Sequence, residues 1–332
     1  MRKIITVAIL TAFLAGSASA EFSKVGSSGA QFLKIAVGSK YQAMGEASVA
    51  MVDDIYATFW NPAGLAAIEN NAVSFTNVDY LLDINLNYIG FARNFEDIGV
   101  FAVSATFLTM DDMEITTLEE QEGSGEYYSA ASYTAGISYA KQLNSKFAFG
   151  ATFKYIGEQI HNERSEGFAF DFGTMLRPGV SSLRLGISIT NMGPELTFSG
   201  SDLVVQYYDE LDEDANPVSA ELQTNPYDLP LAFRIGAAYD VDFASHSVLT
   251  LSSELKHSND NDEKGAIGAQ LGFDERFFLR GGYKINYDEE GLTVGGGINT
   301  GLSSSTRLII DYAWQDFGRL ESTQRFSIGF TF

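Results

Sequence analysis

Cysteine is absent from this 332-residue chain, and proline (six residues), histidine (three) and tryptophan (two) are scarce. Without cysteine the chain has no disulfide framework, no thiol nucleophile and no thiolate metal ligand. The histidines His161, His246 and His257 fall in different predicted hairpins, so neither a histidine metal centre nor a Ser-His-Asp arrangement is indicated. The sequence therefore predicts a protein that is not an enzyme and uses no metal and no cofactor.

Positive charge is also in short supply. The 21 lysines and arginines face 43 aspartates and glutamates, which gives a formal net charge of −22. Nucleic acids and anionic headgroup surfaces repel such a chain, so we expect no nucleic-acid partner.

A long hydrophobic run occurs once, near the start. Arg2 and Lys3 precede an apolar run from Ile4 to about Ala15, and Ala18-Ser19-Ala20 fits a small-residue cleavage site. Residues 1–20 are therefore predicted to be a secretory signal peptide, whose removal takes the net charge from −22 to −24. After residue 20 no apolar run reaches the roughly 18 residues of a membrane-spanning helix.

What the mature chain has instead is alternation. From Ala72 onward, apolar and polar residues alternate in segments of about ten residues, as in Leu183, Leu185, Ile187 and Ile189 against Arg184, Gly186, Ser188 and Thr190. We count fourteen segments, starting near residues 72, 86, 98, 126, 145, 167, 182, 229, 247, 265, 276, 291, 305 and 322. The predicted fold is all-β: a single closed antiparallel transmembrane barrel over residues 72–332.

The connections between these segments differ in length by parity. Those after even-numbered segments are short, whereas those after odd-numbered segments are mostly longer and acidic: residues 111–125, 159–166, 193–228, 258–264 and 286–290. Short periplasmic turns and longer outward loops are typical of outer-membrane barrels. We therefore expect a Gram-negative outer-membrane location with both termini in the periplasm. The acidic loops fit no calcium-loop motif and are interpreted as solvated charge.

The alternation also assigns a face to each charged residue of the segments. If the apolar face meets lipid, a set of charged side chains faces the lumen: Arg184, Arg234, Glu254, Lys256, Arg280, Lys284, Arg307, Asp311 and Arg325. These residues either line a polar passage or form a salt-bridged filling that braces the wall. The last segment carries Phe326, Ile328, Phe330 and Phe332 on one face, which resembles the signal read by the barrel assembly machinery.

Residues 21–71 do not alternate, and they are predicted to form a short helical or coil hatch inside the periplasmic mouth of the barrel. Asn61, Pro62 and Gly64 supply a turn signal. Phe59 and Trp60 are expected to pack against the lumen, and Asp53 and Asp54 to pair with its arginines.

Several motifs carry a resemblance to a known family. The stretches Ala30-Gln31-Phe32-Leu33-Lys34-Ile35, Ala43-Met44-Gly45-Glu46-Ala47 and Trp60-Asn61-Pro62-Ala63-Gly64-Leu65 resemble the start of PorV/PorQ-like outer-membrane proteins, and the last strands look like that family too. The family's fold is similar to that of FadL-type transporters. The resemblance implies a fourteen-stranded barrel with an N-terminal hatch.

The resemblance leaves two functions open. The first is a non-enzymatic component linked to type IX protein secretion, which binds and shuttles cargo at the cell surface. Its partners would be outer-membrane lipid, the barrel assembly machinery, the translocon and the C-terminal domains of secreted cargo. The second is a FadL-like channel for hydrophobic small molecules, in which the hatch moves to open a route.

Overall fold

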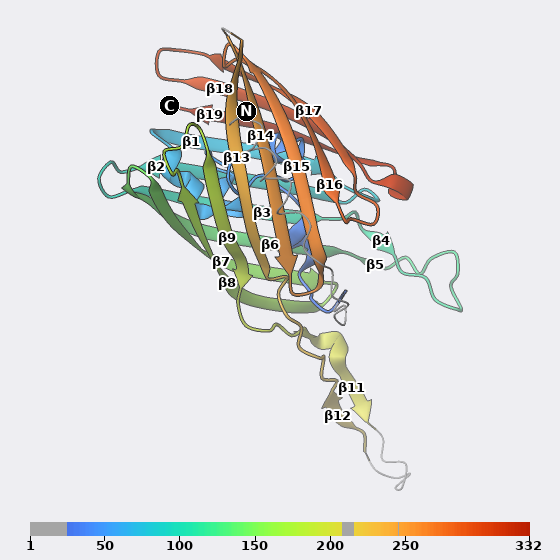
Figure 1. Cartoon of the computed structure of the whole chain (residues 1–332). Coiled ribbons are helices and arrows are strands. Elements are labelled where there is room, and N and C mark those ends of the chain that lie inside the picture. The colour runs from blue at the N-terminus through green and yellow to red at the C-terminus, as the bar shows by residue number, and fades with distance from the viewer. Residues whose placement is uncertain (1–24, 208–215, 245) are drawn as a thin grey trace.

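The computed structural model describes residues 25–207, 216–244 and 246–332. Within these residues the chain forms a closed antiparallel barrel whose lumen holds the segment before the first strand (Figure 1). The predicted signal peptide, residues 1–20, and residues 208–215 of the predicted acidic loop 193–228 lie outside the described residues.

The barrel wall consists of fourteen strands, each paired with its neighbours in sequence order. β1 pairs with β19 and β8 with β9, so the sheet closes. The wall strands are β1 (Asn71–Asp79), β2 (Asn85–Asn94), β3 (Val100–Thr109), β6 (Ala130–Asn144), β7 (Phe147–Ile160), β8 (Glu163–Leu176), β9 (Arg184–Met192), β13 (Ala232–Ala244), β14 (Ser247–Ser258), β15 (Asn261–Phe273), β16 (Phe277–Ile285), β17 (Leu292–Gly301), β18 (Arg307–Asp316) and β19 (Ser322–Thr331). The predicted fold class and strand number are confirmed, and each predicted start lies within about four residues of the observed one.

Alternation along each strand separates an apolar outer face from a polar inner face. On β9, Leu185, Ile187 and Ile189 are 36–40% exposed on the outer surface, whereas Gly186 and Ser188 are buried, and Gly186 lies against the hatch. Because side chains in a strand point alternately to opposite faces, one sequence pattern fixes both surfaces of the wall. No helix among the described residues is long and apolar enough to cross a membrane.

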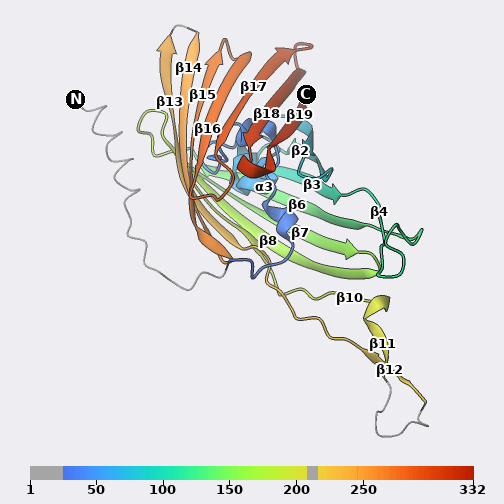
Figure 2. The same ribbon diagram turned by 90° about the vertical axis from the view of Figure 1, so that its right-hand side faces the viewer.

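The two ends of the barrel differ, as the loop lengths predict. The end that carries Asn71 and Phe332 has the short turns, and we call it the short-turn end. The opposite, long-loop end carries the hairpin of β4 (Met113–Glu114) and β5 (Tyr127–Tyr128) and the projecting hairpin of β11 (Val204–Tyr207) and β12 (Val218–Glu221) (Figure 2). Three further short elements lie at this end: β10 (Ser199–Gly200), η3 (Ser201–Leu203) and η4 (Gly318–Leu320).

Two of the predicted long loops are wrong. β7 runs to Ile160 and β8 starts at Glu163, so only His161 and Asn162 connect them. β14 and β15 are likewise joined by Asn259 and Asp260 alone. In both places the polar residues continue the paired strands as hairpins, because backbone pairing outside the membrane does not require apolar side chains.

The hatch, residues 25–70, occupies the lumen as four short helices joined by extended chain. They are η1 (Gln31–Lys34), α2 (Ser39–Gln42), α3 (Ala57–Trp60) and η2 (Pro62–Ala67). Ser28 lies at the long-loop end, where it pairs with Asp228, whereas Asp53 lines cavities beside the short turns. The hatch therefore spans the lumen and is not confined to one mouth. The ends of the sheet, Asn71 and Phe332, lie together, but Ser28 lies at the opposite end from them.

Candidate functional site

The turn signal at Asn61 and Pro62 anchors the hatch to the wall. The side-chain amide of Asn61 donates hydrogen bonds to the carbonyl oxygens of Val49 (2.8 Å) and Thr174 on β8 (3.1 Å). Its Oδ1 accepts a hydrogen bond from the backbone N–H of Ala63 at the start of η2. One side chain thus caps a helix, joins two parts of the hatch and ties both to the barrel.

Glycines on the inner face of the wall make room for backbone and side-chain atoms of the hatch. A Cβ atom at Gly173 would lie 2.0 Å from Oδ1 of Asn61, and one at Gly282 would lie 2.1 Å from the backbone nitrogen of Gly45. Similar close approaches to the hatch occur around the barrel at Gly150, Gly186, Gly236, Gly268 and Gly295. Since these glycines come from seven strands, β7, β8, β9, β13, β15, β16 and β17, the hatch is fitted closely to much of the wall's circumference.

One side of the hatch packs through apolar and aromatic groups. Trp60 is buried, donates its ring N–H to the carbonyl oxygen of Val37, and contacts Phe59 with ring centroids 4.9 Å apart. The hydroxyl of Thr58 lies 2.7 Å from that of Tyr88 on β2. Trp60 and Tyr88 belong to a buried cluster that includes residues of β1, β2, β3, β6, β7 and β8, and Phe59 packs against it.

The opposite side is held by polar contacts with β14–β19. The carboxylate of Glu254 accepts hydrogen bonds from the backbone N–H groups of Ser48 (2.9 Å) and Val49 (2.8 Å). Lys284 forms an ion pair with Glu46 of the hatch. The guanidinium of Arg325 donates to the carbonyl oxygen of Ala36. Buried backbone groups of the hatch thereby find partners in the wall.

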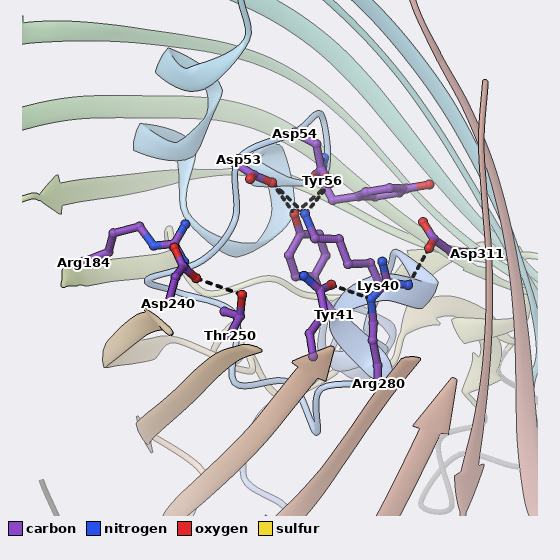
Figure 3. Close-up of polar contacts among 11 residues, drawn as sticks. Lys40, Tyr41, Asp53, Asp54, Tyr56, Arg184, Asp240, Thr250, Arg280 and Asp311 are labelled. Carbon is purple, nitrogen blue, oxygen red and sulfur yellow. Dashed lines mark hydrogen bonds and ion pairs between the residues drawn. The ribbon is translucent and has the colours of Figure 1, made fainter. Parts of the chain in front are cut away.

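Asp53 and Asp54 lie at the end of the hatch that faces the short turns. Their carboxylates point toward Lys40 and Tyr41 (Figure 3). The expectation that they pair with arginines is wrong: Lys40 of α2 lies 2.7 Å from Asp53 and 3.7 Å from Asp54, and the hydroxyl of Tyr41 donates to Asp54 at 2.7 Å. The nearby arginines already have acidic partners, because Arg184 pairs with Asp240 (2.7 Å) and Arg280 with Asp311.

This acidic pair has unequal protonation behaviour. Burial raises the pKa of Asp54 to about 6, and the charge of Asp53 adds to the effect although Lys40 opposes it. Burial also disfavours ionised Asp53, but the ammonium of Lys40 outweighs it and holds the pKa of Asp53 below its usual value. Close to neutral pH, Asp53 is the permanent counter-ion of Lys40, and Asp54 is the group that titrates.

The remaining residues that the sequence placed in the lumen have different environments. Arg234 is buried, 3.5 Å from Glu254, and its side chain donates to Thr190. Arg307 is exposed and lines a cavity at the short-turn end. Lys256 is half-buried and makes no hydrogen bond or ion pair within the described residues. Of the terminal set, Phe326 and Phe332 are 46% and 45% exposed, and Ile328 and Phe330 are half-buried.

The open space in the lumen is unevenly distributed. Cavities of about 330, 790 and 980 Å³ all include Asp53 and lie beside the short turns. On the other side of the hatch, a cavity of only about 30 Å³ lies between Phe59 and the hydroxyl-bearing wall. The hatch thus stands between a wide vestibule and a space that holds a water molecule or two.

Sequence reasoning missed the partners that matter most for the hatch. Lys40 and Tyr41 carried no motif, and the motif that contains Glu46 does not indicate its partner, because the partners are hundreds of residues away or lie across a turn of irregular chain. The inward glycines were detectable, since they alternate with outward apolar residues on β8, β9 and β16. Within the described residues, no group of three or more His, Cys, Asp or Glu is placed to hold a metal ion.

Comparison with known proteins adds a family and a fold. The family described as type IX secretion system protein PorV matches residues 18–175. No curated protein matches the sequence. The family and the similar structures below are described as secretion components, channels or transporters, not as enzymes.

Among solved structures, the CymD monoaromatic hydrocarbon channel is similar with a TM-score of 0.58 and 13% identity, covering 90% of this chain and 98% of that one. The toluene transporter TodX of P. putida has a TM-score of 0.59 and 11% identity, covering 89% and 98%. A FadL homologue of Pseudomonas aeruginosa has a TM-score of 0.51 and 11% identity, covering 89% and 98%. At these identities the likeness shows a shared fold. Together with the family match over residues 18–175, it makes the chain similar to PorV proteins and shows a FadL-like barrel.

Proposed function

We propose that this chain is a non-enzymatic component of type IX protein secretion, which binds secreted cargo at its long-loop end. The observation that carries the proposal is the close fit of the hatch: glycines of seven strands make room for it, and buried ion pairs and hydrogen bonds tie it to the wall. A barrel filled in this way is suited to binding through its rim. The match to the PorV family over residues 18–175 supports the same role.

The rim offers a surface for such binding. The hairpin of β11 and β12 projects beyond the wall (Figure 2), and all eight of its strand residues are exposed. Val205, Tyr207, Val218 and Ala220 share one face of it. An isolated two-stranded hairpin is marginally stable in water, so a bound partner would stabilise it.

The proposal includes an orientation. The short-turn end, with Asn71 and Phe332, faces the periplasm, and the acidic long-loop end faces outward. The barrel would reach the outer membrane through the assembly machinery, with Phe326, Ile328, Phe330 and Phe332 in its insertion signal. Its partners there would be outer-membrane lipid, the translocon and the C-terminal domains of cargo.

Affinity capture of the full chain from detergent-solubilised membranes tests this role. Secreted proteins that share a C-terminal domain should be recovered, and Tyr207→Ser with Val218→Ser should lower their recovery at least tenfold. Leu292→Ser, on the outer face of β17 away from the hairpin, is the control for a lost apolar surface residue. Recovery of assembly chaperones alone would overturn the proposal.

A second candidate is a channel for hydrophobic small molecules. The vestibule beside Asp53 and the fold shared with a monoaromatic hydrocarbon channel favour it. In this role the hatch would have to leave the wall. Uptake of long-chain or aromatic hydrocarbons should then fall on deletion of the chain, and unchanged uptake would reject the channel.

A further inference from the structure

Three cationic residues form a row across neighbouring strands near the long-loop end of the lumen. Arg234 on β13 lies directly opposite Lys256 on β14, and Lys256 lies directly opposite Lys264 on β15. All three share the inner face of the wall with Glu254, whose carboxylate contacts the hatch. Like charges placed directly opposite each other destabilise a sheet, so the row needs a compensating negative charge.

Four carboxylates near the row are already engaged. Glu254 binds the backbone N–H groups of Ser48 and Val49 and lies 3.5 Å from Arg234. Glu46 and Glu290 both bind Lys284. Asp260 accepts hydrogen bonds from Lys34, Gln31, Ser28 and Ser258.

Two lysines are therefore left without an acidic partner. Among the residues that the structure describes, neither Lys256 nor Lys264 makes a hydrogen bond or an ion pair. The ammonium of Lys264 lies 4.2 Å from the ring centroid of Tyr287, and that of Lys284 lies 4.3 Å from the same centroid. This aromatic ring fixes Lys264 beside the lumen without neutralising it.

The two free ammonium groups are placed to act together and can be reached from solvent. Paired residues on adjacent strands have Cβ atoms about 5 Å apart, so both side chains can converge on one anion. A bulge next to Lys256, where the β14–β15 register shifts, turns the end of the strand at this point. Both lysines keep part of their surface exposed.

We propose that Lys256 and Lys264, flanked by Arg234, form a binding site for a phosphate group at the long-loop end of the lumen. A phosphate carries close to two negative charges at neutral pH and three acceptor oxygens, which match two ammonium groups better than a single carboxylate does. The phosphate can be free or can belong to a lipid headgroup. This site is separate from the projecting hairpin and does not depend on the proposed secretion role.

Isothermal titration of the full chain in detergent, with inorganic phosphate at constant ionic strength, tests the site. Phosphate should bind the wild type, and Lys256→Gln with Lys264→Gln should weaken the affinity at least tenfold. Lys146→Gln, an exposed lysine in a turn at the other end, is the matched control and should bind like the wild type. The melting temperature of the double variant without phosphate should equal or exceed that of the wild type, since the repulsion is removed.

A second titration with dihexanoyl phosphatidic acid distinguishes the two sources. Binding of inorganic phosphate assigns the site to the free anion, and binding of the lipid phosphate alone, lost in the double variant, assigns it to a headgroup. If neither ligand binds the wild type, or the double variant binds both as well as the wild type does, the proposal is overturned.

Discussion

The two halves of the lumen hold the same hatch by different means. The inner face of β1–β8 is lined mainly by small hydroxyl-bearing and apolar residues, such as Thr76, Ser138 and Ala148, and it packs against the apolar side of the hatch. The inner face of β13–β19 carries Glu254, Lys284 and other charged residues, which bind the backbone and side chains of the hatch. One half supplies burial of apolar surface, and the other supplies partners for buried polar groups.

This difference shows why the hatch can be irregular. A segment with short helices leaves many backbone groups without partners of their own, and a wholly apolar wall would leave them unsatisfied. A wholly charged wall would give no hydrophobic stabilisation. A wall with one apolar half and one charged half provides both hydrophobic stabilisation and hydrogen-bond partners for the hatch. Substitutions can weaken each of these two contributions separately.

The largest expected effect is on the charged half. Glu254→Ala removes the acceptor for two buried N–H groups and leaves Arg234 without its carboxylate, so the free energy of unfolding should fall by about 4 kcal/mol. Urea titration of the chain folded in lipid vesicles measures it. Glu263→Ala, which removes a 79% exposed carboxylate from the next strand, should leave the free energy of unfolding close to that of the wild type. If Glu254→Ala and Glu263→Ala changed the free energy of unfolding equally, Glu254 would not hold the hatch.

On the apolar half, Leu65→Ala should lower the free energy of unfolding by about 3 kcal/mol. Leu65 of η2 is fully buried in the cluster that joins the hatch to β1–β8, and truncation leaves a cavity there. The comparison is with Leu279→Ala on the outer face of β16, where the side chain is 62% exposed. A loss no larger than that of Leu279→Ala would contradict the assignment of the hydrophobic contribution to this half.

Gly282→Ala tests the close fit itself. The new methyl group would meet the backbone of Gly45, so the hatch must shift. The free energy of unfolding should fall by about 2 kcal/mol. Planar-bilayer recordings of the variant should also show higher conductance than the wild type. Gly281 is adjacent, but an added Cβ there has no neighbour closer than 3.9 Å, so Gly281→Ala should behave as wild type. Identical recordings for the two variants would argue against a closely fitted hatch.

The smallest effect concerns pH. Because the pKa of Asp54 is raised to about 6 in the folded chain, its contribution to stability is complete below its unfolded value of 3.8 and is lost as pH rises through 6. Asp54→Asn should therefore raise the free energy of unfolding at pH 7 by about 1 kcal/mol, given solvent screening. It should also flatten the plot of unfolding free energy against pH between pH 3.8 and about 6. Asp53, whose pKa is lowered, acts in the opposite sense: its contribution to stability is present above its unfolded value of 3.8 and is lost as pH falls below that value. If the pH dependence of the unfolding free energy were the same in Asp54→Asn as in the wild type, another group would be the one that titrates.

The barrel could be predicted from the sequence because its pattern is local. Alternation over ten residues fixes the two faces of a strand, and the loop lengths separate the two ends. The hatch could be recognised as the segment that does not alternate, but its contacts could not be derived. Ser39 binds Ser327, and Gln42 binds Gln315, across more than 270 residues, and nothing near either residue indicates its partner. The pairing of Lys40 with Asp53 was missed because it depends on an irregular path between them.

The central claim is that the chain works with its hatch in place. Ser39 of α2 and Ser327 of β19 have hydroxyl oxygens 2.8 Å apart, and the chain has no cysteine of its own. Ser39→Cys with Ser327→Cys can therefore form one disulfide that locks the hatch to the wall. We predict that the oxidised double variant captures secreted cargo as well as its reduced form does. Loss of capture on oxidation, with recovery on reduction, would contradict the account and show that the hatch must move.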